Sequence, residues 1–456
     1  MKKLLTLSLA ILLLFSVFTA CSPKVNDKPK DDFEVNVNID KNITATLEIM
    51  VPDNDQNREK SIIDAVAKGF NIQYPNVTIK TRGAEISDEK YMETIGSLLQ
   101  VNRVPDLVYT NTALYYYLIS KNVVLPLNAY FDAAIDADLL DMADYHEEYF
   151  DMASYEGKRY AMPRNADTVV TYYNKDMLEA AGIVTSGPNK DARLSNDWTW
   201  DDFVSINKDL VTFWDKDRVT YNKYYGIRQT VLDWESIWNP LMLSMGASVY
   251  KDGAPNANST EMKAFANLYK ELVTEKITPA WDSGSESRFS TGTAAFEFAS
   301  DSPGFMSRDE AVKGKFDILP FPKAGDNGKI GTGFAGWGIY SGSKNADLAW
   351  AFLQYLISYE GQMAIISGNP YSTPSVLRSI NEEKGWTKGY ESLNIDAFMY
   401  NGENKVTPQY FKGFDPKYMF EIQYAIQDFT HNILNSKKSV DDAISLATTK
   451  LAAAIK

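Results

Sequence analysis

The chain has 456 residues and a formal charge of −14, because its 60 acidic side chains outnumber its 46 basic ones. This acidic surplus argues against nucleic acid and anionic lipid headgroups as partners. With two histidines and one cysteine, the chain is also a poor candidate for a His/Cys zinc site or a cysteine–histidine catalytic pair. We therefore expect no metal, no cofactor and no enzymatic activity.

The N-terminus has the charge, length and order of a secretory signal. Two lysines precede an apolar run from Leu4 to Phe18, and about 15 residues are too few for the roughly 20 that span a bilayer. The only cysteine, Cys21, follows directly after two small residues. The segment from Phe18 to Cys21 resembles a bacterial lipobox, in which the cysteine is diacylated and the signal, here residues 1–20, is removed.

The segment after the cysteine is polar. Residues 22–42 are rich in Asp, Asn, Lys and Pro, which predicts a flexible tether. We therefore expect residues 21–43 to form a lipidated cysteine, carrying palmitate or a similar acyl chain, and its tether. Two or more acyl chains hold a protein firmly at a membrane surface, so the protein would be anchored at the outer face of the bacterial cell membrane without spanning it.

The segment 46–111, which follows the tether, alternates between strand and helix patterns. Apolar periodicity predicts strands at 46–51, 77–81 and 105–111, with amphipathic helices at 61–75 and 90–102. This order indicates a parallel sheet with crossover helices, so the fold class is α/β. Because the chain beyond the tether is longer than the roughly 250–300 residues over which one hydrophobic core keeps growing, we expect two lobes.

The pattern continues to the C-terminus without a tandem repeat. Helices are predicted at 175–182, 198–211, 236–247 and 259–273, and the segment 347–456 reads as mostly helical. Thr199 is a candidate cap for the second of these helices. Strands are predicted at 159–163, 168–174, 224–229, 293–300, 316–322 and 333–341.

From about Thr46 onward, the order of segments resembles the extracellular solute-binding proteins of ABC importers, in particular the carbohydrate-binding family 1 that includes maltose-binding protein. The matching segments are 105–108, 124–128, 155–163, 173–175, 179–183, 198–203, 336–338, 343–345 and 349–353. The resemblance implies a type II periplasmic-binding-protein-like fold, in which two hinged α/β lobes close on a ligand. The implied N-terminal lobe is 44–164 plus 301–344, and the implied C-terminal lobe is 165–300 plus 345–456.

Candidate ligand contacts follow from the strand ends and from the aromatic residues. Open α/β sheets bind ligands at the carboxyl ends of their strands, which selects Asp53, Asn54, Asn111, Thr112 and Asp301. A sugar also needs an aromatic platform. The candidates for that platform are Trp234 and Trp238, four residues apart, and Trp337, whose glycine neighbours would let its ring project into open space. The resemblance adds Asp167, at the spacing of a sugar-binding carboxylate, with Asn165 beside it.

Several alternatives remain open at this stage. A secreted glycoside hydrolase also places carboxylates beside aromatic residues, although no segment here resembles a hydrolase motif. Tyr172 and Tyr173 resemble the paired tyrosines of ferric-ion carriers, but neighbours on a strand point to opposite faces. A polyamine or a peptide is a further candidate ligand. The resemblance implies a monomer that binds a sugar or oligosaccharide and contacts the membrane subunits of an importer.

Overall fold

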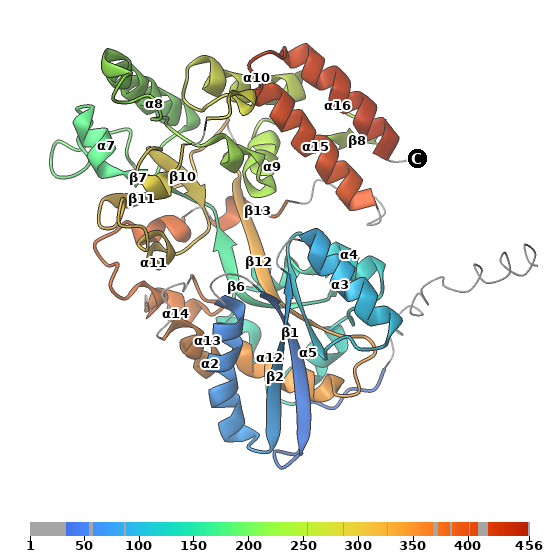
Figure 1. Ribbon diagram of the computed structural model, residues 1–456. Coiled ribbons are helices and arrows are strands. Elements are labelled where there is room, and N and C mark those ends of the chain that lie inside the picture. The colour runs from blue at the N-terminus through green and yellow to red at the C-terminus, as the bar shows by residue number, and fades with distance from the viewer. Residues whose placement is uncertain are drawn as a thin grey trace, which may run out of the picture.

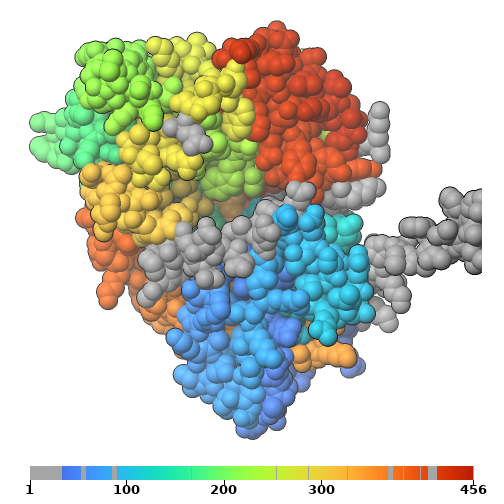
Figure 2. Space-filling model, viewed as in Figure 1, coloured from blue at the N-terminus to red at the C-terminus, as the bar shows by residue number. Residues whose placement is uncertain are grey.

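The computed structural model describes residues 33–53, 58–85, 88–252, 254–285, 287–325, 327–367, 373–383, 385–400, 402–408 and 418–454. Two lobes lie one above the other, joined by a narrower waist of strands (Figure 1). Figure 2 shows the same division on the surface, with the blue N-terminal segments below and the green, yellow and red segments above. The fold is α/β, as the sequence predicts, with one sheet in each lobe.

The first lobe is built on a six-stranded mixed sheet. Five strands lie in the order β13-β12-β3-β1-β2, and β6 pairs with β12. The pairs β1–β2 and β1–β3 are parallel, whereas β12 runs antiparallel to β3 and to β6. The strands are β1 (Ala45–Asp53), β2 (Val77–Glu85), β3 (Leu107–Asn111), β6 (Met162–Thr168), β12 (Ile330–Ile339) and β13 (Lys405–Val406).

The second lobe contains a three-stranded antiparallel sheet in the order β10-β7-β11. Its strands are β7 (Val170–Asn174), β10 (Phe296–Ala299) and β11 (Phe316–Pro320). Every residue of β7 is buried, because helices and loops cover both faces of the sheet. Two short hairpins complete the strands, β4 (Ser154–Tyr155) with β5 (Lys158–Arg159) and β8 (Tyr250–Lys251) with β9 (Ala254–Pro255).

Helices pack around both sheets. Those of the first lobe are α2 (Arg58–Gln73), α3 (Asp88–Gln100), α4 (Tyr115–Ser120), α5 (Asn128–Asp136), α6 (Glu147–Asp151), α12 (Ala346–Ile357), α13 (Tyr359–Ile366) and α14 (Arg378–Glu382). Those of the second are α7 (Lys175–Ala180), α8 (Trp200–Trp214), α9 (Glu235–Ser244), α10 (Thr260–Thr274), α11 (Pro303–Met306), α15 (Met419–Leu434) and α16 (Val440–Ala454). Within the described ranges, no helix is both long and apolar enough to cross a membrane.

Short 3-10 turns link several of these elements. They are η1 (Met142–Asp144), η2 (Asp215–Asp217), η3 (Gln229–Asp233), η4 (Trp281–Ser283), η5 (Phe289–Thr291), η6 (Gly385–Thr387), η7 (Ile395–Phe398) and η8 (Gly402–Asn404). The predicted cap at Thr199 is present, since its side chain and that of Asp202 form a capping box at the start of α8.

The connection between the lobes runs through β6. The sequence predicts one continuous strand at 168–174, but the structure divides this segment at Val169. Thr168 pairs with β12 in the first sheet, and Val170 pairs with β10 and β11 in the second. The antiparallel pair of β6 and β12 therefore forms the waist in Figure 1.

The lobe boundaries differ from the expected ones in several places. Residues 165–168 of β6 and strand β13, expected in the second lobe, pair in the sheet of the first. β11 lies within the range 301–344 expected in the first lobe, yet it pairs with β7 of the second lobe. Conversely, α12 and α13 lie in the range 345–456 expected in the second lobe, yet they pack on α2 and β6 of the first. The reason is the apolar surface of α12, where Trp350 stacks on Tyr130 with 5.2 Å between ring centroids.

The described part of the expected tether also packs against the protein. Residues 33–40 alternate between partly buried and exposed side chains, and the partly buried ones, together with Ile43, contact the core of the first lobe. Phe33 lies 5.8 Å from the ring of Tyr130, and the backbone N–H of Asn36 donates to Asp347. The prediction of a flexible tether is therefore wrong for 33–43, because the polar composition conceals apolar residues at every second position.

The predicted strand at 224–229 is also absent from the described chain. Tyr225 makes one isolated bridge with Ala294, and η3 begins at Gln229. Gly226 presses against the side chain of Asn207, where a Cβ atom at position 226 would lie 1.7 Å from Oδ1. Backbone hydrogen bonds of Tyr225 and Gly226 to residues 293–296 and to Ile277 also hold the segment, although they do not form a regular strand.

Candidate functional site

A cavity of about 420 Å³ lies at the waist, bounded by both lobes. This volume is within the roughly 300–1,000 Å³ of small-molecule sites. The end of β3, strand β6 and the first half of β12 bound it from one side, and the start of α9 and one face of α15 bound it from the other. Its lining residues are Asn111, Thr112, Ala113, Asp167, Val169, Trp234, Glu235, Ser236, Ser300, Thr332, Gly333, Phe334, Gln423 and Gln427.

The end of β3 supplies the first polar group. The side-chain oxygen of Asn111 accepts from the backbone N–H groups of Ala113 and Leu114, both at 2.9 Å, which forms the turn into α4. The hydroxyl of Thr112 accepts from the backbone N–H of Phe334 at 2.9 Å. Both strand-end residues line the cavity, so both stay candidate ligand contacts.

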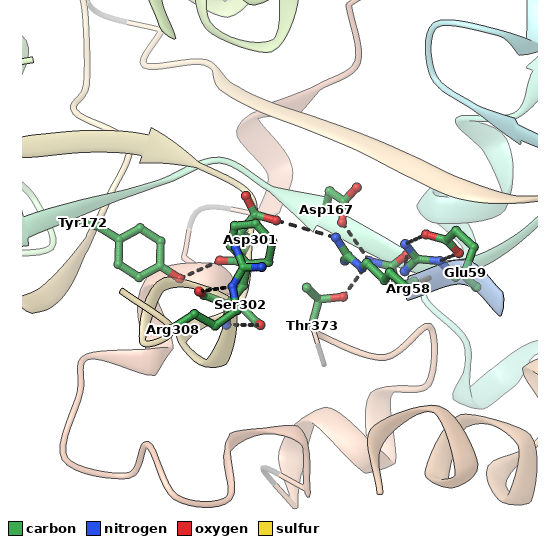
Figure 3. Close-up of polar contacts among 11 residues, drawn as sticks. Arg58, Glu59, Asp167, Tyr172, Asp301, Ser302, Arg308 and Thr373 are labelled. Carbon is green, nitrogen blue, oxygen red and sulfur yellow. Dashed lines mark hydrogen bonds and ion pairs between the residues drawn. The ribbon is translucent and has the colours of Figure 1, made fainter. Parts of the chain in front are cut away.

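Asp167 lines the cavity from β6 and is held by a network behind it. The amide nitrogen of Asn165 donates to Asp167 Oδ1 at 2.7 Å and to Thr373 Oγ1 at 2.5 Å. Asn165 itself is 2% exposed, so its position is that of a support rather than a cavity wall. Behind it, the guanidinium of Arg164 makes two hydrogen bonds to Glu59, at 2.7 and 2.9 Å. Figure 3 shows Asp167 beside Thr373 and Glu59.

Trp234 is the tryptophan of the cavity. It is the N-cap of α9, with extended backbone angles that turn the chain into the helix, and its side chain is partly buried. Trp238 lies one turn further along α9 and is 0% exposed. Trp234 therefore stays a candidate ligand contact, whereas the prediction for Trp238 is wrong, because this side chain packs in the core of the second lobe.

The expectation for Trp337 is wrong. Its side chain is 0% exposed, its indole N–H donates to the carbonyl of Met50 at 2.9 Å, and it meets Tyr109 edge-on. The ring therefore packs on the face of the first sheet, against Tyr109 of β3 and the backbone of β1. The neighbouring Gly336 allows β6 to lie close to β12 and does not make room for the Trp337 ring. A Cβ atom at position 336 would lie 1.9 Å from the carbonyl oxygen of Met162.

Two further cavities adjoin the first. One of about 460 Å³ shares Trp234 and Ser300 with it and includes Asp301. The other, of about 280 Å³, shares Asn111, Asp167 and Phe334 with it. The central cavity thus shares wall residues with one cavity lined by the second lobe and with another lined by the first.

Charged residues line these two flanking cavities. Asp301, predicted from its strand end, faces Arg58 of the other lobe, with 3.6 Å between the guanidinium and the carboxylate. Burial raises the pKa of the Asp301 carboxyl, and Arg58 opposes that rise. Glu297 is 6% exposed, and burial raises its pKa to about 7 although Arg228 lies beside it.

Three predicted residues cannot be placed. Cys21 and Asn54 lie outside the described residues, and of Asp53 the structure describes the backbone at the end of β1 alone. Conversely, the sequence analysis missed Ser300, Thr332, Phe334, Gln423 and Gln427. For the last two a signal existed, because polar residues four apart share one face of a helix.

The two adjacent tyrosines of β7 do not form a shared site. Both are 0% exposed, and their hydroxyls point to different partners. That of Tyr172 donates to the carbonyl of Asp301, and that of Tyr173 donates to the carboxylate of Asp317. Among the described residues, no cluster of three or more His, Cys, Asp and Glu side chains is arranged to hold a metal ion.

Comparison with known proteins agrees with this architecture. An ABC substrate-binding protein of Listeria monocytogenes, solved with cycloalternan, superposes with a TM-score of 0.72 at 18% identity, covering 90% of this chain and 99% of that one. The GacH receptor of Streptomyces glaucescens, solved unliganded and with acarbose, gives 0.68 at 19% identity, covering 91% and 99%. At these identities the likeness shows the fold, which is that of two-lobed solute-binding proteins.

Sequence relatives point the same way. A binding protein of Brucella abortus is 21% identical over 305 residues, which cover 64% of this chain and 67% of that protein. The arabinooligosaccharide-binding protein of Halalkalibacterium halodurans is 25% identical over 150 residues, 32% of this chain and 30% of that protein. The model of the bacterial extracellular solute-binding protein family matches residues 65–391. Since this match covers well over half of the chain, the protein belongs to that family.

Proposed function

We propose that this protein captures a sugar or oligosaccharide in the cavity between its lobes and delivers it to the membrane subunits of an ABC importer. The observation that carries the proposal is the lining of the central cavity. It combines one tryptophan with amides, hydroxyls and two carboxylates, Asp167 and Glu235, and none of the described residues that line it is basic. Amides and carboxylates bind hydroxyl groups, and an aromatic ring covers the apolar face of a sugar.

The two-lobed form supports delivery of the ligand to an importer that recognises the closed arrangement of the lobes. The cavity takes wall residues from β3, β6 and β12 on one side and from α9 and α15 on the other. A ligand that contacts both sides favours the closed arrangement of the lobes, since it binds that arrangement better. An importer that recognises the closed shape then distinguishes the loaded protein from the empty one.

The location of the protein is part of the proposal. The family is extracellular, and the arrangement of charged, apolar and small residues before Cys21 supports a lipid anchor on the outer face of the cell membrane. Cells fed a labelled fatty acid test this anchor. The label is expected on the native protein, and a Cys21→Ala variant is expected to lack it and to leave the membrane fraction.

Ligand capture is tested with residues 22–456, which contain every described residue. Thermal shift against mono- and oligosaccharides, polyamines, peptides and ferric citrate identifies the ligand, and calorimetry gives its affinity. Ligand at a hundred times its dissociation constant stabilises a folded protein by about 2.7 kcal/mol. We expect a saccharide to produce this shift and to be recovered chemically unchanged.

Matched variants connect the binding to the cavity. Trp234→Ala and Asp167→Asn are expected to weaken saccharide binding at least tenfold. Tyr359→Ala and Asp136→Asn, at exposed positions, are expected to bind as the native protein does. A polyamine, a peptide or ferric ion as the only ligand would keep the fold and overturn the ligand class, while turnover of the sugar would show a hydrolase.

A further inference from the structure

Two aromatic rings, one from each lobe, meet beside the central cavity. Tyr117 lies on α4 of the first lobe and Phe420 on α15 of the second, and their rings make an edge contact with 6.4 Å between centroids. Figure 1 shows α15 reaching from the second lobe toward α3 and α4. Because the two rings belong to different lobes, this contact exists only while the lobes are closed.

The phenylalanine shares a face of α15 with two residues of the cavity wall. Phe420, Gln423 and Gln427 are spaced three and four residues apart, so they lie on one side of the helix. The two glutamines line the central cavity. Phe420 is one turn nearer the start of the helix and does not belong to the described lining. The helix therefore places its glutamines over the cavity and its phenylalanine against the opposite lobe.

α15 is joined firmly to the other cavity residues of the second lobe. The hydroxyl of Thr430 donates to the carboxylate of Asp233 at 2.9 Å, and Asp233 directly precedes Trp234 of the cavity wall. Another face of the helix is buried in the core of the lobe. A movement of Phe420 toward or away from the first lobe is therefore shared by the cavity wall that α15 carries.

α4 is joined to the strand-end residues of the first lobe in a similar way. The side-chain oxygen of Asn111 accepts from two backbone N–H groups in the turn that leads into α4. The hydroxyl of Tyr117 donates to the carbonyl of Met92 on α3 at 3.4 Å, and Lys121 Nζ lies 5.9 Å from the ring centroid. These contacts come from the first lobe alone, so the ring is in place before the lobes close.

The aromatic pair and the ion pair of Arg58 and Asp301 lie on opposite sides of the waist. Arg58 begins α2, and Asp301 lies just before α11. Figure 1 shows α2 and α11 on one side of the waist and α4 and α15 on the other. A contact on one side alone would let the lobes rotate about it, whereas two contacts fix how far both sides close.

We propose that Tyr117 and Phe420 are positioning residues, which hold α15 closed over the ligand without touching it. Loss of their contact then weakens every ligand by the same factor, because the closed protein becomes rarer by that factor. An edge-to-face pair shifts such an equilibrium by roughly two- to tenfold. This inference rests on the proposed function only in that a solute binds between the lobes.

Spin labels on Lys68→Cys and Glu310→Cys, one in each lobe, test the contact without any ligand. In Phe420→Leu and in Tyr117→Leu, the ratio of closed to open protein is expected to fall roughly two- to tenfold. Phe420→Tyr and Tyr117→Phe keep the rings and are expected to give the native ratio. Tyr359→Leu, at an exposed aromatic residue of the first lobe, is the control and should also leave the ratio unchanged.

Calorimetry on residues 22–456 tests the positioning role, with maltose, maltotriose and α-1,5-linked arabinotriose as probes. Each Leu variant is expected to weaken the binding of every probe by the same factor, roughly two- to tenfold, so that the ratios between probes stay native. The double variant Tyr117→Leu/Phe420→Leu is expected to bind as the weaker single variant does, since either change alone removes the contact. Thermal unfolding verifies that each variant is folded.

The outcomes separate this inference from the proposed function. Additive losses in the double variant, or a native ratio of closed to open protein in both Leu variants, overturn the contact and leave sugar capture intact. A changed order of affinity among the probes in Phe420→Leu makes Phe420 a ligand contact and overturns its positioning role. Failure of every saccharide to bind overturns the proposed ligand class, and the spin labels then decide the contact by themselves.

Discussion

Arg58 and Asp301 meet across the interface between the lobes, with 3.6 Å between Nη1 and Oδ1. Arg58 is the first residue of α2 in the first lobe, and Asp301 follows β10 in the second (Figure 3). The hydroxyl of Tyr172, on the neighbouring strand β7, donates to the Asp301 carbonyl at 2.5 Å. The ion pair thus joins two rigid elements, and it contributes free energy only while the lobes are closed.

Breaking this pair is expected to open the ligand-free protein. The side chains of Arg58 and Asp301 are 18% and 35% exposed, and partly exposed pairs contribute about 0.2–1 kcal/mol. Arg58→Met should therefore shift the ratio of closed to open protein by roughly 1.4- to fivefold. Spin labels on Lys68→Cys and Glu310→Cys, one in each lobe, report this as a longer distance by electron resonance. Lys60→Met on the same helix is the control, and an unchanged distance in Arg58→Met would contradict the role.

The three tryptophans considered as ligand contacts are expected to differ in how much their replacement by Ala lowers the free energy of unfolding. Trp337 and Trp238 are 0% exposed, so replacement of either by Ala should lower the free energy of unfolding by about 3–5 kcal/mol. Trp234→Ala should lower it by less than about 1.5 kcal/mol, because its side chain is partly exposed at the cavity, while weakening sugar binding at least tenfold. Urea unfolding measures all three. Equal destabilisation by the three variants would contradict the assignment.

Much of the fold could be predicted from the sequence because it follows from periodicity. The strands and helices from β1 to β3 have the predicted order, and the apolar spacing alone distinguishes period 2 from period 3.6. The division at Val169 could not be predicted, since Val170 continues the β-rich pattern of β6 without interruption and only the pairing partners change. The apolar alternation at 33–39 is short and lies within a segment of polar composition, which favours the prediction of a tether.

The candidate site was harder to predict, because its residues come together from distant segments. Strand ends indicated Asn111 and Thr112, which line the cavity, since topology fixes which edge of a sheet binds a ligand. Gln423 and Gln427 belong to the C-terminal part of the sequence, and only the packing of α15 over the waist brings them to the cavity. Tryptophan fits a core and a binding site equally well, so Trp337 could not be assigned without knowing that its ring packs against Tyr109 and bonds to Met50.

The buried ion pair behind Asp167 is expected to be sensitive to removal of one partner. The side chains of Arg164 and Glu59 are 4% and 5% exposed, and a buried charge left alone destabilises a protein by about 3–5 kcal/mol. Glu59→Gln should therefore lower the free energy of unfolding by that amount. Asp64→Asn, exposed on the same helix, should change it by no more than about 0.5 kcal/mol, as surface substitutions generally do. Comparable effects of the two substitutions in urea unfolding would argue against the pair.

Glu297 is expected to give the ligand-free protein a pH-dependent stability. Burial raises its pKa from 4.5 to about 7, so between these values the folded chain holds a proton that the unfolded chain has lost. Stability therefore falls as pH rises through this window and levels off above about pH 7. The difference is about 3 kcal/mol, and Glu297→Gln should remove it. Denaturation at about pH 5 and pH 8 measures this, with the exposed Glu261→Gln as control, and an identical pH dependence in native protein and Glu297→Gln would disprove the role of this carboxyl.

The waist should tolerate no side chain at Gly336. A Cβ atom there would lie 1.9 Å from the carbonyl oxygen of Met162 and 3.0 Å from Cα of Pro163, at the point where the register of β6 against β12 shifts. Both atoms belong to the backbone, so relief requires the two strands to separate, and Gly336→Ala should lower the free energy of unfolding by about 2–3 kcal/mol.

The same substitution at Gly96 is the matched control. This glycine lies inside α3, where an added Cβ meets only the hydroxyl of Tyr117 at 4.0 Å among the described residues. Alanine is the better helix former by up to about 1 kcal/mol, so Gly96→Ala should raise stability while Gly336→Ala lowers it. Opposite signs in urea unfolding would locate the constraint in the pairing of β6 with β12. If Gly336→Ala were also stabilising, the strands that join the lobes could not lie as close as the structure places them, and the cavity walls built on them would have to be reassigned.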